Sequence, residues 1–117
     1  MSKKIWNHEP KKKRNNMKQY KEVTWKGKKI KLPFPDPRDN ESELYEMEEK
    51  QNRFTGESTT MPSFAAGVYE VILGQEYAAT IDDKRLGTGG SKKWDDVRKG
   101  LDWFRRYFAA QYMVVLD

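Results

Sequence analysis

The sequence predicts a mainly α fold in which two long antiparallel helices pack with a short acidic helix, a small N-terminal β-hairpin and a disordered basic arm. Apolar residues recur at spacings of three and four over residues 62–79 and 92–115, which is typical of amphipathic helices. Residues 20–32 instead alternate apolar and charged side chains, as strands do. Residues 1–18 are basic and lack periodicity, so we expect a flexible arm before one compact domain, residues 19–117.

The predicted hairpin over residues 20–32 turns at Lys26-Gly27, because glycine readily adopts the positive φ of a tight turn. Lysines would line its outer face. Its inner face would hold Val23, Trp25, Ile30 and Leu32. An isolated hairpin is marginally stable in water, so this inner face must rest on the helices. Three prolines within residues 33–37 then hold the chain extended as a spacer or a strap across the body.

The acidic helix is expected over about residues 40–52. Asp39 or Asn40 would cap its start, and glutamates lie in its first turn, where negative charge is favourable. Leu44 and Met47, with Tyr45 as a further candidate, provide only a narrow apolar face. We therefore expect a short and mostly exposed helix, followed by a loop.

The next helix is expected over residues 62–79, with Thr60 as its cap and Pro62 in its first turn, a position that tolerates proline. Its apolar residues at helical spacing are Phe64, Val68, Ile72, Leu73 and Tyr77. Gly67 and Gly74 lie seven residues apart within it. Each glycine costs about 1 kcal/mol relative to alanine, and the close approach of another backbone would compensate for this cost.

The last helix is expected over about residues 92–115, after a loop at 81–90, with Ser91 as its N-cap. One apolar stripe would face the core: Val97, Leu101, Phe104, Phe108, Tyr112 and Val115. A second stripe contains Trp103, Tyr107 and Val114, and it lies about 100° further round the helix. These three residues are candidate interface residues for self-association or a protein partner. The alternative is that the hairpin covers them.

Composition excludes several kinds of chemistry. The chain has no cysteine, which rules out disulfides, thiol nucleophiles and thiolate zinc sites. His8 is the only histidine, and its place in the arm makes it a poor general base or metal ligand. We expect no catalytic residues, no metal, no cofactor and no small-molecule substrate. No segment has the apolar length of a membrane span or of a secretion signal, so a cytoplasmic protein is expected.

Charge is distributed unevenly along the chain. Residues 1–31 contain twelve basic and two acidic residues, residues 32–60 contain three and eight, and residues 61–117 contain eight of each. Such a basic arm suits phosphate backbones, and its aromatic residues suit base stacking. The candidate nucleic-acid-binding residues are Lys3, Lys4, Trp6, Lys11, Lys12, Lys13, Arg14 and Lys18. The alternatives are a solubilising tail and an arm that docks on the protein's own acidic helix.

The loop from Gly87 to Ser91 precedes a helix N-terminus and the basic residues Lys92 and Lys93. Backbone amides at such a place can bind phosphate. The spacing matches neither the P-loop nor the dinucleotide-binding fingerprint. An ordinary loop with a helix cap is therefore the favoured interpretation.

Glu43, Glu46 and Glu49 recur every three residues. Repeated carboxylates on one helical face can bind magnesium, as in the all-α nucleoside-triphosphate pyrophosphohydrolases, which use a Glu-x-x-Glu motif. Glu70 and Glu76 do not have the spacing of the second acidic motif that such enzymes require. A solvated helix face is the favoured interpretation.

Two segments, residues 61–74 and 94–104, begin Met-Pro-Ser-Phe-Ala-Ala-Gly and Trp-Asp-Asp-Val-Arg-Lys-Gly. Together they resemble small uncharacterised proteins of marine tailed phages that infect cyanobacteria. The resemblance implies an accessory phage protein that acts in the host cell or is packed in the virion. It implies no catalytic residues.

The sequence therefore favours a non-catalytic accessory module for interaction or assembly, which could self-associate as a homodimer through the last helix. The first alternative is an accessory protein that binds nucleic acid through the basic arm. The second alternative is a nucleotide-processing enzyme built on the acidic helix.

Overall fold

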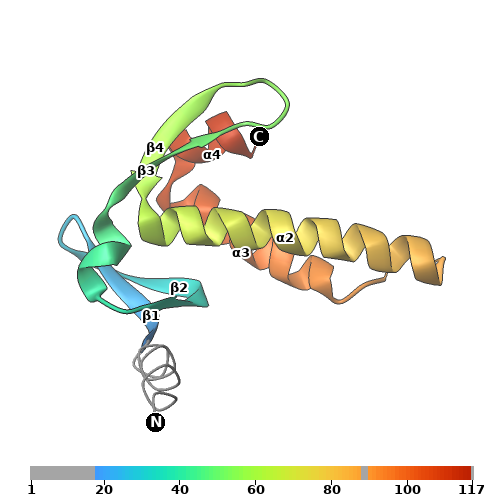
Figure 1. The fold of residues 1–117 in the computed structure, drawn as a ribbon, viewed down its shortest axis with the longest axis horizontal. Coiled ribbons are helices and arrows are strands. Elements are labelled where there is room, and N and C mark those ends of the chain that lie inside the picture. The colour runs from blue at the N-terminus through green and yellow to red at the C-terminus, as the bar shows by residue number, and fades with distance from the viewer. Residues whose placement is uncertain (1–17, 88–89, 117) are drawn as a thin grey trace, which may run out of the picture.

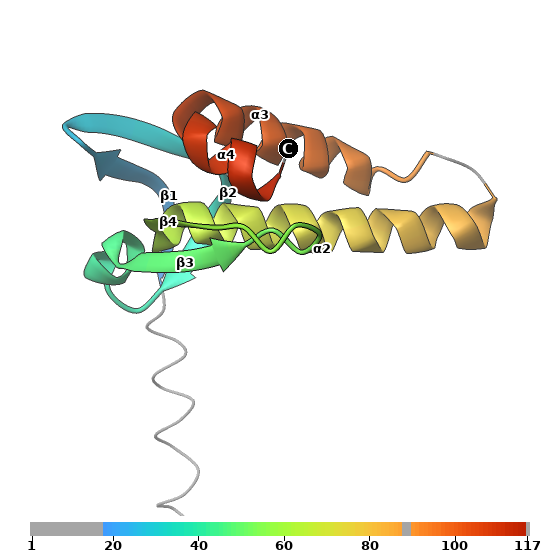
Figure 2. The ribbon, with the colours of Figure 1, turned by 90° about the horizontal axis from the view of Figure 1, so that it is seen from above.

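The computed structural model describes residues 18–87 and 90–116. Within these residues, two antiparallel hairpins and three α-helices pack together, with the hairpins gathered around the first half of the longest helix (Figures 1 and 2). In chain order the elements are β1 (Lys18–Trp25), β2 (Lys28–Arg38), the 3-10 helix η1 (Glu41–Tyr45), β3 (Met47–Gln51), β4 (Ser58–Pro62), α2 (Ser63–Leu86), α3 (Lys93–Tyr107) and α4 (Ala109–Val115).

The predicted arrangement of two long helices, a short acidic helix and one small hairpin is wrong. The described residues form a second hairpin, β3–β4, and the predicted last helix is divided into α3 and α4. The coarse mainly α character agrees with the prediction, since more described residues lie in helices than in strands.

The N-terminal hairpin turns where the sequence predicts, at Lys26 and Gly27, with φ angles of 52° and 81°. Two consecutive positive φ angles are typical of the type I′ turn, which matches the twist of paired strands. Val23 lies opposite Ile30, and both side chains are buried. The proline-rich stretch is not a separate strap, because it belongs to β2. This strand continues to Arg38, which pairs with Lys18 of β1.

The predicted acidic helix is replaced by η1 and the strand β3. Leu44 is the one buried residue of η1, so a longer helix here would have had little apolar surface to bury. Glu49 and Lys50 instead pair with Thr60 and Thr59 of β4, and threonine is a good strand former. The preference of glutamate for helices is thus overridden by strand pairing.

Asn52 is a central residue of the turn between β3 and β4. Asn52 is buried, and its side-chain oxygen accepts hydrogen bonds from the backbone N–H groups of Phe54 and Thr55, at 2.7 and 3.0 Å. Its side-chain amide donates to the carbonyl oxygen of Val114 at 2.9 Å. Asn52 therefore fixes the turn and also ties the second hairpin to α4.

Helix α2 is longer than predicted, and its cap differs. The helix begins at Ser63, and its N-cap residue is Pro62 rather than the predicted Thr60. It ends at Leu86, and the C-cap residue Gly87 adopts a left-handed conformation with a φ of 70°. The Gly87 N–H donates to the carbonyl oxygen of Asp83 at 2.8 Å, as in helix-terminating glycine motifs. The C-terminal half of α2 extends away from both hairpins and packs along α3 (Figure 2).

The last helix breaks at Phe108, whose φ and ψ of −135° and 55° are not helical. The break lets the Phe108 ring pack within 5.7 Å of both Phe64 and Trp103, measured between ring centroids. It also turns α4 back against β4, as Figure 1 shows. Burying this ring offsets the loss of helical continuity.

Helices α2 and α3 pack tightly against each other at Gly100. A Cβ atom placed there would lie 2.5 Å from Cγ1 of Ile72 and 3.2 Å from the ring of Phe34. The two glycines that the sequence singles out behave differently. A Cβ atom placed on Gly74 would have no neighbouring atom within 4 Å, and one placed on Gly67 would lie 3.1 Å from the carboxylate oxygen Oδ2 of Asp36. The close backbone approach predicted at Gly67 and Gly74 is therefore wrong, and the tight contact between α2 and α3 lies at Gly100 instead.

No helix among the described residues is long and apolar enough to cross a membrane.

Candidate nucleic-acid interface

The basic side chains of the described residues fall into two groups. One group is neutralised by carboxylates: Arg38, Lys50, Arg53, Lys93, Arg98 and Arg105. The second group has no ion-pair partner within the described ranges. Six of its members line the two hollows described below: Lys26, Lys28, Lys29, Lys31, Lys99 and Arg106. The other five are Lys18 and Lys21 on β1, and Lys84, Arg85 and Lys92 near the connection between α2 and α3. The unpaired group is the more effective attractor of an external anion.

Strand pairing determines where the hairpin lysines lie. Lys28 is opposite Trp25, and Lys29 is opposite Thr24. Because successive side chains alternate between the two faces of a strand, Lys29 and Lys31 share one face while Lys28 lies on the other. The prediction that the lysines line the outer face is therefore correct for Lys29 and Lys31 and wrong for Lys28.

A hollow of about 760 Å³ lies between the hairpin and the junction of α3 with α4. We call it the first hollow. Its lining contains four basic residues and no acidic residue: Trp25, Lys26, Lys28, Lys29, Ile30, Met47, Thr60, Pro62, Arg106, Tyr107, Phe108 and Gln111. A surface with cationic walls and an aromatic floor is suited to an anionic ligand that also carries flat apolar groups.

A second hollow of about 590 Å³ adjoins it. Its lining residues are Lys31, Pro33, Lys99, Asp102, Trp103, Arg106 and Tyr107. Asp102 is its only acidic residue, and that carboxylate is paired with Arg105 at 2.6 Å. Both hollows share Arg106 and Tyr107, so we treat them as one surface, the basic trough.

The aromatic side chains of the trough are held by the core. Trp25 packs edge-on against Phe64 with ring centroids 5.6 Å apart, and the Lys26 ammonium lies 5.9 Å from the Trp25 ring centroid. Tyr107 is 39% exposed and packs at 5.6 Å from Trp103. The trough thus presents Tyr107 and the partly buried Trp25 on a fixed support.

Most of the basic arm lies outside the described residues. This applies to Lys3, Lys4, Trp6, Lys11, Lys12, Lys13 and Arg14. Lys18 is described, and it lies exposed at the first position of β1. The trough was not among the predicted sites, although the three lysines within residues 28–31 were a signal for a positive surface on the hairpin.

The proposed second stripe of the last helix is not an exposed surface. Trp103 is only 7% exposed, and its indole N–H donates to the carbonyl oxygen of Lys31 at 2.8 Å. Its ring lies 5.8 Å from that of Phe104, so the expectation that these two rings point into different environments is wrong. Val114 is partly buried, and Tyr107 alone of the three candidates remains substantially exposed.

The acidic residues proposed for magnesium are separated by the new secondary structure. Glu43 belongs to η1 and Glu49 to β3, with Glu46 between these elements, so they do not lie on one helical face. Glu70 instead pairs with Lys50, and Glu76 pairs with Arg53 at 2.8 Å. Within the described ranges, no group of three or more histidine, aspartate or glutamate side chains is arranged to hold a metal ion.

The end of the glycine-rich loop is occupied by the protein's own carboxylates. The Ser91 N–H donates to Asp83 at 3.1 Å, the Ser91 hydroxyl donates to Asp82 at 3.0 Å, and Lys93 pairs with Asp82 at 2.6 Å. The Lys93 hydrogen bond, followed by that of Ser91, lowers the pKa of Asp82. Negative charge at this helix start disfavours phosphate and supports the interpretation as an ordinary loop. The predicted N-cap Ser91 is wrong by one position, because α3 begins at Lys93 with Lys92 as its N-cap residue.

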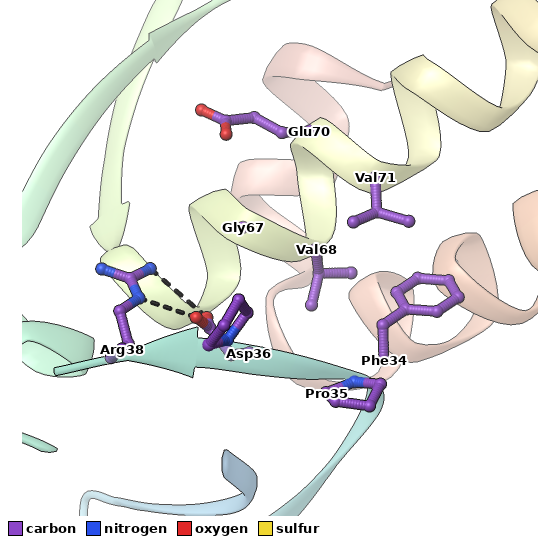
Figure 3. A pocket seen from close by; sticks show the side chains of 9 residues that line it. Phe34, Pro35, Asp36, Arg38, Gly67, Val68, Glu70 and Val71 are labelled. Atoms are coloured by element: carbon purple, nitrogen blue, oxygen red, sulfur yellow. Dashed lines mark hydrogen bonds and ion pairs between the residues drawn. The ribbon is translucent and has the colours of Figure 1, made fainter. Parts of the chain in front are cut away.

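A further cavity of about 380 Å³ lies beside the proline-rich part of β2 and the start of α2 (Figure 3). Arg38 borders it and holds Asp36 through two hydrogen bonds, of 2.7 and 3.3 Å, and the Asp36 bond raises the pKa of Arg38. Arg38 also donates to the carbonyl oxygens of Ser63 at 3.1 Å and Glu43 at 3.4 Å. With its donors engaged in this way, Arg38 joins β2, η1 and α2, and it is better explained as a structural clamp than as a ligand-binding group.

The comparisons with known proteins give no match: no family model, no curated protein and no solved structure matches this chain. The resemblance to phage proteins stays a prediction.

Proposed function

We propose that this protein binds nucleic acid without catalysing a reaction on it, and that the basic trough is its binding surface. The observation that carries the proposal is that six unpaired cations line two adjoining hollows whose only lining carboxylate, Asp102, is already paired. An unpaired cation on a surface attracts phosphate more strongly than one that is already neutralised.

The position of the trough in the chain adds to this argument. The residues that precede β1 contain six basic side chains and one acidic side chain. They join the hairpin at Lys18, at the end of β1 opposite to the turn that borders the first hollow. A polyanion long enough to run from the trough along the hairpin would also reach the arm, and each additional phosphate contact releases counterions.

The alternative proposal, self-association through the last helix, has less support. It depended on Trp103, Tyr107 and Val114 forming a free apolar stripe. Trp103 is buried and hydrogen-bonded within the chain. Tyr107 therefore remains as the one exposed residue of the three, and its neighbours in the lining of both hollows include several basic residues. The charge of this surface favours an anionic partner over a second copy of the chain.

The experiment is a titration of the full chain against a fluorescently labelled 20-nucleotide DNA between 50 and 200 mM salt, followed by anisotropy. The trough variant carries Lys28→Gln and Lys29→Gln. The matched control carries Lys84→Gln and Lys92→Gln, which remove the same charge at the far end of α2 and at the start of α3 (Figure 1).

We expect the trough variant to bind more weakly and to lose about one unit of salt slope for each phosphate contact removed. The control should behave as the unmodified chain. Equal losses in both variants would mean that binding depends only on net charge, and an absence of binding at 50 mM salt would refute the proposed function.

A further inference from the structure

The two hollows of the trough share only two lining residues, Arg106 and Tyr107. These side chains therefore form a ridge between the hollows. Arg106 brings a cation to the ridge, and Tyr107 brings an aromatic ring that is 39% exposed. A ligand that fills both hollows must pass over this ridge.

Each hollow combines an apolar floor with basic residues in its lining. Lys28 lies on the same face of β2 as Ile30, whereas Lys29 and Lys31 lie on the opposite face and border the hollows from the edge of the strand. Ile30, Pro62 and Phe108 are buried residues beneath the first hollow, and Trp103 is the buried ring of the second. The lysines at their edges, Lys28 and Lys31 among them, are exposed. This arrangement suits a chain of flat rings linked by phosphates, with rings directed inward and phosphates directed to the edges.

The bases of a double helix are stacked on one another and cannot enter separate hollows, whereas the bases of a single strand can be splayed apart. The volumes of about 760 and 590 Å³ fall within the range of ligand pockets. Building on the proposed function, we propose that the trough binds single-stranded nucleic acid, with one base in each hollow and Tyr107 stacked between neighbouring bases.

The test compares four ligands of similar length with the full chain at one salt concentration. They are a 12-nucleotide single strand, a 12-base-pair duplex, an abasic 12-unit deoxyribose phosphate chain and a 12-residue polyglutamate peptide. The abasic chain keeps the phosphates and lacks the rings, so it separates stacking from charge. The peptide represents an acidic protein partner.

The variants are Tyr107→Leu, which removes the ring, and Tyr107→Phe, which keeps it. Tyr77→Leu is the matched control, because Tyr77 is 70% exposed on the far part of α2. Circular dichroism melting checks that each variant is folded. Quenching of tryptophan fluorescence provides a second readout, because Trp25 lines the first hollow.

We expect the single strand to bind at least tenfold more tightly than the abasic chain, in keeping with base–aromatic stacking. Tyr107→Leu should lower single-strand affinity about tenfold without changing abasic binding or the salt slope. Tyr107→Phe and Tyr77→Leu should bind normally.

The inference is overturned if the duplex or the peptide binds as tightly as the single strand, or if the abasic chain does. It is also overturned if both Tyr107 variants bind normally. If the duplex or the abasic chain binds as tightly as the single strand, the affinity of the Lys28→Gln, Lys29→Gln variant distinguishes the two proposals. A weaker affinity of that variant would retain the trough as the nucleic-acid-binding surface and would remove only the stacking role of Tyr107.

Discussion

The indole N–H of Trp103 donates a 2.8 Å hydrogen bond to the backbone carbonyl oxygen of Lys31. This bond joins α3 to β2 across 72 positions of the chain. It holds the lysine-bearing strand beside the α3 residues Arg106 and Tyr107, so the core residue Trp103 determines the position of the trough.

Trp103→Ala should lower the free energy of unfolding by about 3–5 kcal/mol, because it removes a large buried ring and leaves a cavity. It should not change the oligomeric state. Urea denaturation and light scattering measure these two properties. A variant with normal stability and altered association would restore the interface interpretation of this residue.

Gly100→Ala should destabilise the protein even though alanine favours helices, because the new Cβ would lie 2.5 Å from Cγ1 of Ile72. Overpacking of this kind costs about 1–3 kcal/mol. Gly74→Ala is the matched control in α2, where a Cβ meets nothing within 4 Å, and it should stabilise by up to about 1 kcal/mol. Chemical denaturation that ranks the two variants in the opposite order would contradict the α2–α3 packing described above.

Arg38→Met should destabilise the protein by about 2–3 kcal/mol, because it leaves the buried Asp36 carboxylate without its hydrogen-bond donors. The double variant Asp36→Leu with Arg38→Met should recover part of this loss, since no charge is then left unpaired. Thermal unfolding of the two single variants and the double variant gives the coupling free energy. A coupling near zero would show that the clamp does not contribute to stability.

Asp82 supplies a pH-dependent contribution to stability. Its pKa is lowered from the ordinary value of 3.8, chiefly by the Lys93 hydrogen bond. A lowered pKa in the folded state means that the stabilisation is present above pH 3.8 and is lost as the pH falls through the folded value. Lys93→Met should raise the pKa of Asp82 measured by carboxyl NMR, whereas Lys92→Met should leave it nearly unchanged. An unchanged pKa in the Lys93 variant would exclude this ion pair in solution.

Local patterns in the sequence were sufficient for some elements and not for others. The Lys26-Gly27 turn and the alternation of Val23 with Trp25 determine the first hairpin through short-range geometry. The α2 helix follows from regular apolar spacing, and the core positions Phe64 and Phe104 were predicted correctly.

The failures arise where distant contacts override local preference. Residues 47–51 are glutamate-rich and favour helix in isolation, yet they pair with β4, whose partner residues lie between seven positions (Gln51 with Ser58) and fifteen positions (Met47 with Pro62) further along the chain. The break at Phe108 depends on ring contacts with Phe64 and Trp103, which no local spacing reveals. The trough is assembled from the hairpin and α3, so the sequence offered its lysines but not their juxtaposition with Tyr107.

The most direct test of the central claim is an NMR map of backbone amide shifts in the full chain as the 12-nucleotide single strand is added. We expect the largest shifts at residues 26–31 and 99–108, which border the trough, in addition to any in residues 1–17. Residues 77–86, at the far end of α2, should not shift. Shifts confined to residues 1–17, or centred on the far end of α2, would contradict the assignment of the basic trough as the binding surface.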